Sequence, residues 1–228
     1  SVEGDRAFLD ALRTGLRELG LDDGVAIRIV SRHADGDIAR AGDLIKELIS
    51  LGVDVFLAPG PAAARAVRRV TATPVVAVQL PPGKSDPDLY ASLARPGGTV
   101  TGLSSFGEGL SAKRIELVKE MLPGLTAIGI IHNGTDPNFR DWGTETEADA
   151  RRQGLAGLRV PVTSTSPLEL DEAFAKLKAD GATAVIVIRD YITTALREQI
   201  ARRGLDLGMA VVGEHRDFAE AGSLCSYG

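Results

Sequence analysis

The feature that most constrains this chain is a regular alternation of short apolar segments with amphipathic segments of about 10 to 15 residues. Several of these segments, among them 53–58 and 182–188, contain runs that are apolar at successive positions, at 55–58 and 184–188, and such runs have no polar face. Strands of this kind are typical of a parallel sheet covered by helices on both sides. We therefore predict an α/β fold.

The first half of the chain is predicted to alternate in this way from its beginning. A helix over about 5–19 ends at Gly20, and a β-rich run follows at 25–30. Asp37 is expected to cap a helix that ends before Gly52. The further predicted elements are strands at 53–58, 74–80 and 99–105 and a helix from Pro61 to about Val70.

The second half repeats the pattern after a predicted helix at 110–122. Strands are expected at about 126–132, 158–163, 182–188 and 209–213, with helices at about 139–153, 168–180 and 191–203 between them. A short helix at 216–221 and a final strand at 223–227 complete the prediction. The chain thus contains two α/β units.

These units are predicted to be two Rossmann-like lobes with parallel sheets joined by a hinge. The N-terminal lobe would comprise 1–102 and the C-terminal lobe 103–225, with 226–228 crossing back toward the first lobe. No linker rich in Ser, Gly or Pro separates the lobes, so short extended crossovers would form the hinge. In open parallel sheets a ligand lies beyond the carboxyl ends of the strands. Candidate binding residues should therefore follow the strands.

In the N-terminal lobe, the candidates are backbone groups and one amide. Gly60 and Pro61 open a predicted helix whose free N–H groups at Ala62 and Ala63 are flanked by small side chains, which suits the approach of a carboxylate. The same residues would also serve simply to start a helix. Gln79 lies at the exit of the next strand.

In the C-terminal lobe, the candidates are polar side chains after successive strands. They are His132, Asn133, Asp136, Asp190, Tyr191 and Glu214. Each has a structural alternative: the residues after 132 form a polar turn, Asp190 could cap the next helix, and Glu214 could pair with nearby Arg216. The ammonium or hydroxyl groups of a small metabolite are the ligand groups that such side chains would bind.

The charge, the hydropathy and the cysteine content limit which partners and locations are expected for this chain. The chain has 26 basic and 31 acidic residues, a net charge of −5 and no dense Lys/Arg cluster, so nucleic acid is not an expected partner. No apolar run is long enough for a membrane span, and the first residues lack the plan of a signal peptide. The single cysteine, Cys225, permits no internal disulfide and leaves the compartment open.

Catalytic and cofactor motifs are weak in this sequence. Gly107, Gly109 and Ala112 imitate a dinucleotide fingerprint, but no strand-end acid follows about 20 residues later. The three histidines are spread over both lobes without metal-ligand spacing. We therefore predict no cofactor and no metal. An α/β enzyme that uses Asp190, Glu214 and His132 as acid and base groups remains an alternative.

Several segments together resemble a known family. They are 15–20, 53–58 with 61–63, 91–104 (ASLARPGGTVTGLS), 111–120 (SAKRIELVKE), 123–125 and 218–228 (FAEAGSLCSYG). In order and spacing they are similar to bacterial substrate-binding proteins of ABC importers, and to the tryptophan-binding-like components in particular. The 91–104 segment is the most specific. The resemblance covers nearly the whole chain.

The resemblance implies a type I periplasmic-binding-protein fold and a solute, an amino acid or related carboxylate, held between the lobes without chemistry. It also implies an ABC permease as partner, a monomer, and a periplasmic or lipid-anchored extracytoplasmic location, with the signal sequence absent from the chain as given. Relatives begin with a strand before the first helix and end with a return segment, and neither is expected here.

Two departures affect what can be carried over from this family. His132 stands where relatives usually have an aromatic residue, and Tyr191 stands where they often have proline, so tryptophan is not transferred as the ligand. A ligand-sensing domain of a regulator or receptor with the same fold is the alternative function.

Overall fold

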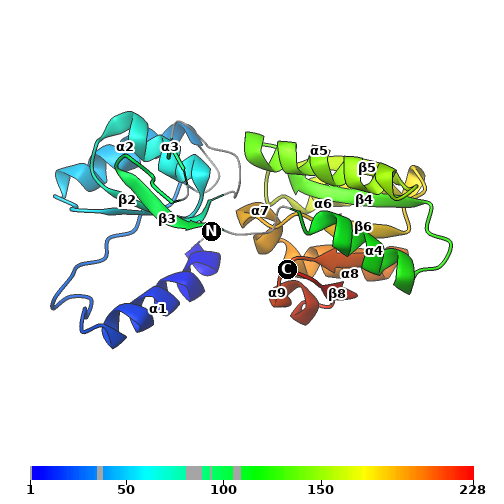
Figure 1. Cartoon of the computed structure of the whole chain (residues 1–228). Coiled ribbons are helices and arrows are strands. Elements are labelled where there is room, and N and C mark those ends of the chain that lie inside the picture. Colours follow the sequence, from blue (N-terminus) through cyan, green and yellow to red (C-terminus); the bar gives the residue numbers. More distant parts are fainter. Residues whose placement is uncertain (1, 35–37, 81–88, 93, 105–108) are drawn as a thin grey trace. The chain divides into compact units, whose positions relative to one another are not determined.

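The computed structural model describes residues 2–34, 38–80, 89–92, 94–104 and 109–228 (Figure 1). The chain divides into two compact units, which are described separately. The N-terminal unit comprises Ser1–Leu80 and Lys84–Leu103, and the C-terminal unit comprises Ser104–Gly228 together with Pro81–Gly83. The predicted cap Asp37 and the fingerprint residue Gly107 lie outside the described residues.

The N-terminal unit contains a three-stranded sheet in the order β1-β2-β3. Its elements are α1 (Val2–Glu18), α2 (Ile38–Ser50), β1 (Phe56–Ala58), α3 (Pro61–Val70), β2 (Val75–Leu80) and β3 (Val100–Ser104). Strand β1 runs parallel to β2, with Phe56 opposite Val75. Both residues are buried with Ile45 of α2 and Val67 of α3, so helices and sheet share one apolar core.

One predicted strand of this unit is wrong. The run at 25–30 begins as a turn, in which the N–H groups of Ala26 and Ile27 donate to the carbonyl oxygen of Asp22 at 3.0 and 3.3 Å, and continues without regular structure at 28–30. Val25 is 87% exposed. A strand exists only where a neighbour completes its hydrogen-bond ladder, and within the described residues this run makes only an isolated bridge between Asp23 and Ile27. Residue preference alone did not make it a strand.

The C-terminal unit is built around a five-stranded parallel sheet. Its elements are α4 (Ser111–Met121), β4 (Ala127–Asn133), α5 (Pro137–Arg152), β5 (Ala156–Val162), α6 (Pro167–Ala179), β6 (Ala184–Val187), α7 (Tyr191–Ala195), α8 (Arg197–Leu207), β7 (Ala210–Gly213), α9 (Arg216–Glu220) and β8 (Cys225–Ser226). All four predicted strands between 126 and 213 are present within a few residues of their expected ends.

Helices cover both faces of this sheet. On one face Ile128 and Ile186 pack with Ile115 of α4, and on the other Ile131 packs with Phe174 of α6 and other buried residues from the helices of that face. Alternate residues of the same strand thus enter different apolar layers. This arrangement explains why the strands are apolar at successive positions, and it confirms the predicted α/β fold with a parallel sheet.

The strand order β5-β4-β6-β7-β8 indicates where a ligand site is expected in this sheet. From β4 the chain passes through α5 to β5 on one side, and from β5 it passes through α6 to β6 on the other side of β4. The connections therefore diverge between β4 and β6. In doubly wound sheets such a switch point, at the carboxyl ends of the strands, is where ligands bind.

The helix predicted at 191–203 is two helices. Leu196 ends α7 and precedes α8, with φ −92° and ψ 1°, and its side chain is buried in the core. The interruption falls at a buried leucine, and helical periodicity does not reveal it. None of the described helices is both long and apolar enough to cross a membrane.

Candidate functional site

Asn133 and Asp190 meet across the switch point of the C-terminal sheet. The side-chain amide of Asn133, at the end of β4, donates to Oδ2 of Asp190, which follows β6. The Oδ1 atom of Asn133 accepts from the N–H and the hydroxyl of Thr135, each at 2.7 Å. Asn133 is completely buried. Its amide therefore fixes the strand exits to each other.

Asp190 also caps helix α7. Its Oδ1 atom accepts from the backbone N–H of Thr193 at 2.9 Å and from the Thr193 hydroxyl at 3.0 Å, and the Asp190 N–H donates back to that hydroxyl. This reciprocal arrangement is a capping box. Burial raises the pKa of Asp190, and the hydrogen bonds from Thr193 and Asn133 oppose that rise. The capping alternative left open by the sequence is thus present.

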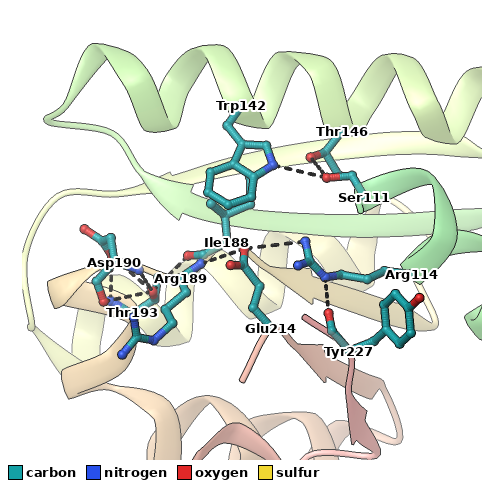
Figure 2. Close-up of polar contacts among 10 residues, drawn as sticks. All are labelled: Ser111, Arg114, Trp142, Thr146, Ile188, Arg189, Asp190, Thr193, Glu214 and Tyr227. Carbon is teal, nitrogen blue, oxygen red and sulfur yellow. Dashed lines mark hydrogen bonds and ion pairs between the residues drawn. The ribbon is translucent and has the colours of Figure 1, made fainter. Parts of the chain in front are cut away.

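Glu214, after β7, is held by a different set of contacts (Figure 2). Its Oε1 atom accepts from the backbone N–H of Arg189 at 3.1 Å and lies 3.6 Å from Nη1 of Arg114. Burial raises the pKa of Glu214 to about 7, while Arg114 and the Arg189 N–H act to lower it. The alternative pair with Arg216 is not present among the described residues, where Arg216 bonds Glu220 at 2.7 Å instead.

Arg114 is the functional candidate that sequence reasoning missed. Its side chain is completely buried, and Nε donates to the carbonyl oxygen of Tyr227 at 2.6 Å. A signal was present in the sequence: at helical spacing Arg114 shares the face of α4 that carries Ile115 and Val118, which are core residues. That signal is weak, because arginine is rarely buried without a partner.

The side chain of His132 diverges from that of Asn133, although the two were predicted together, and its Nδ1 atom lies 3.1 Å from the Asn133 carbonyl oxygen. Its ring packs under α5, where a Cβ added to Gly143 would come 2.9 Å from His132 Cδ2. Neighbouring residues of a strand face opposite sides, so His132 and Asn133 diverge. Burial lowers the pKa of His132. His132 is thus buried beside α5, and whether it contacts a solute stays a prediction.

Trp142 is a second feature of the α5 side. Its indole N–H donates to Oγ of Ser111 at 3.1 Å, and Ser111 in turn bonds Thr146 at 3.0 Å (Figure 2). All three side chains are buried. The contacts join α4 to α5 beside Ile188, which packs with Trp142. The indole N–H of Trp142 therefore has its hydrogen-bond acceptor within the protein.

The remaining predicted residues differ in exposure. Tyr191, the first residue of α7, is 53% exposed, whereas Asp136 is buried and caps α5 by accepting from the N–H of Asn138 at 2.9 Å. Gln79 lies in β2, but its side chain is outside the described part. In the described residues no three His, Cys, Asp or Glu side chains gather as a metal site requires.

The beginning of α3 has the form that the sequence predicted. Gly60 has φ 151°, a backbone conformation that favours glycine, and Pro61 follows as a buried first residue of the helix. No side chain caps this end. Ala62 is exposed and Ala63 is partly buried. Whether the N–H groups of this turn bind an anion stays a prediction.

The model of the ABC transporter substrate binding protein family matches residues 2–228. The chain belongs to this family. The match confirms the resemblance predicted from the motifs and covers almost every residue.

Individual relatives agree with this assignment. A tyrosine-binding protein from Clostridioides difficile is 29% identical over 126 residues, which are 55% of this chain and 36% of that relative. The chain thus matches only about a third of the curated protein. Two solved structures have TM-scores of 0.81 and 0.80, a conserved domain protein from Vibrio cholerae at 22% identity and an ABC domain in complex with L-Trp from Streptococcus pneumoniae at 23%. Each match covers 94% of this chain and 71% of the other. These structures confirm the predicted fold class.

Proposed function

We propose that this chain is the solute-binding component of an ABC importer and that it binds an amino acid or a related carboxylate without chemical change. Family membership supports the transport role. The relatives whose names state a tyrosine or L-Trp ligand support an amino acid. An ABC permease is the proposed partner, and the proposed location is outside the cytoplasm.

The observation that carries the ligand class is the contrast between Asp190 and Glu214. Glu214 faces the cation of Arg114, whereas Asp190 receives hydrogen bonds but has no ion-pair partner among the described residues. Burial without a cation disfavours the charged form of a carboxylate, and an ammonium placed beside it would stabilise that form. Asp190 lies at the switch point, and exposed Tyr191 follows it directly. We assign the ammonium of the solute to Asp190, with Tyr191 beside it.

Taken by itself, the N-terminal unit offers the first turn of α3 as a place that suits a carboxylate group. The N–H groups of Ala62 and Ala63 point along the helix axis at its positive end, where an anion is favoured. Gly60 and Pro61 add no side-chain acceptor that would compete with it. In an importer of this class, binding shifts the population toward the form that the permease recognises.

The first test is calorimetric titration of the purified chain with two matched solutes. L-Tyrosine carries an ammonium, and 3-(4-hydroxyphenyl)propionate is the same molecule without it. We expect L-tyrosine to bind at least 10-fold more tightly, because a hydrogen bond to a charged group contributes about 1.5–3 kcal/mol. A folded chain that binds neither of these, nor any of the other 19 amino acids, contradicts the proposal.

The Asp190→Asn variant sharpens this test. It should lose most of the preference for L-tyrosine over the deaminated analogue. Thr193→Val is the matched control, since it removes a hydroxyl bonded to the same carboxylate and leaves the charge. An equal loss of preference in both variants would show that the effect comes from the hydrogen bonds that cap α7. It would then not come from an ion pair between Asp190 and the solute ammonium.

A separate measurement addresses chemistry. Mass spectrometry after prolonged incubation should recover the bound solute unchanged, as transport requires. Conversion of the solute by wild-type protein, lost in Asp190→Asn or Glu214→Gln, would favour the enzyme alternative instead.

A further inference from the structure

Arg114 connects the first helix of the C-terminal unit to its last strand. It lies in the first turn of α4, and its Nε atom donates to the carbonyl oxygen of Tyr227, just after β8 and 113 positions along the chain. The guanidinium is completely buried. A single side chain therefore ties together the two ends of this unit.

The same guanidinium reaches the candidate site through Glu214 (Figure 2). Nη1 of Arg114 lies 3.6 Å from Oε1 of Glu214, and this oxygen also accepts the backbone N–H of Arg189. Arg189 directly precedes Asp190. The contacts thus run from α4 through Glu214 to the turn that carries Asp190 and starts α7.

The charges around Glu214 make Arg114 its main counterion. From the end of β6, Arg189 contributes its N–H and a more distant charge, and Asp190 adds a like charge. His215 follows Glu214 on the same segment, and burial lowers its pKa. Nη1 and Nη2 of Arg114 have no hydrogen-bond partner among the described residues, so its cation is compensated mainly by Glu214. Each of the two buried charges is therefore costly without the other.

We propose that Arg114 is a positioning residue for solute binding: it holds Glu214 against the Arg189 N–H and thereby fixes the turn that carries Asp190. This inference rests on the proposed function for its binding readout. It does not place Arg114 in contact with the solute. Its action is through Glu214.

The experiment compares Arg114→Lys, Arg114→Met, Glu214→Gln and the double variant, with L-tyrosine as the probe at pH 6 to 9. Wild-type affinity should fall several-fold toward pH 6, as Glu214 takes up a proton. In Arg114→Met the midpoint of this fall should move up by at least one pH unit. Arg114→Lys keeps the charge and should raise the midpoint by less than Arg114→Met does. Glu214→Gln should remove this fall and leave only the titrations that all the variants share. An unshifted midpoint in Arg114→Met would overturn the proposal.

The double variant separates positioning from simple loss of packing. If Arg114 acts through Glu214, adding Glu214→Gln to Arg114→Met should cause less than a twofold further loss of affinity. Independent, multiplying losses would contradict the inference. If Arg114→Met does not fold, the pH profiles of Arg114→Lys and Glu214→Gln decide: Arg114→Lys must raise the midpoint and Glu214→Gln must remove it.

Hydrogen exchange without any solute distinguishes this inference from the proposed function. Amide exchange at Arg189, Asp190 and Thr193 should become at least 10-fold faster in Arg114→Lys or Arg114→Met, while the amides of α6 stay unchanged. If wild-type protein binds no amino acid but this local acceleration is found, the function fails and the positioning contact stands. Unchanged or uniformly faster exchange overturns the positioning role.

Discussion

The two units of the chain differ in what their interiors contain. Among the described side chains, every buried polar or charged residue lies in the C-terminal unit: Ser111, Arg114, His132, Asn133, Asp136, Thr146, Asp190, Thr193 and Glu214. The buried core of the N-terminal unit is apolar. The C-terminal unit therefore fixes its strand exits by bonds between side chains, and the N-terminal unit offers mainly backbone groups at α3.

This difference has an energetic consequence. A satisfied polar network in a low-dielectric interior is strong, but removal of one member leaves another unpaired. An apolar core loses stability more gradually, according to volume and close contacts. Substitutions should therefore reduce the stability of the two units by different mechanisms.

The largest expected effect is that of Arg114→Met in the C-terminal unit. Loss of the cation leaves Glu214 buried without a counterion and the Tyr227 carbonyl without its donor, so unfolding free energy should fall by about 3–5 kcal/mol in urea denaturation. Arg68→Met is the control in the N-terminal unit, since Arg68 is exposed and bonds Thr99 at 3.1 Å. That variant should lose less than about 1 kcal/mol. Equal losses would remove the contrast between the units.

The next effect is the pH dependence of stability that Glu214 contributes. Because burial raises its pKa from 4.5 to about 7, the unfolded chain releases this proton at a lower pH than the folded chain does. Stability from Glu214 is therefore present below pH 4.5 and is lost as the pH rises to 7, by on the order of 3 kcal/mol.

Glu214→Gln removes this titration. Urea denaturation of wild type and variant at pH 4.5 and pH 7 isolates it, because the shifts of Asp190 and the histidines are common to both proteins. The difference in unfolding free energy between them should change by about 3 kcal/mol across that range. A constant difference would show that Glu214 titrates normally.

The smallest effect concerns a close backbone approach in the N-terminal unit. A Cβ added to Gly102 of β3 would lie 1.8 Å from the carbonyl oxygen of Ala77 in β2. Gly102→Ala should therefore cost about 1–3 kcal/mol in thermal or urea unfolding. Gly15→Ala is the control: it meets nothing within 4 Å in α1 and should stabilise by up to about 1 kcal/mol. Similar values for the two variants would contradict the close packing of β2 and β3.

The sequence predicted the candidate site only in part, and the residues show why. Asn133 and Asp190 could be placed together because strand ends of a parallel sheet share one edge. The same reasoning included His132, since it did not determine which face of β4 the ring would take. It missed Arg114, whose contact with Tyr227 joins residues 113 positions apart. Local pattern does not specify such pairs.

Sequence alone determined the α/β alternation, the start of α3 at Pro61 and the family, because local periodicity, helix-start chemistry and motif order are all properties of the chain itself. Tertiary structure decided what depends on neighbours. It left 25–30 outside any strand, since no described strand completes its ladder, and it paired Glu214 with Arg114 instead of nearby Arg216. Backbone ladders and buried charges are satisfied by whatever the fold brings alongside them.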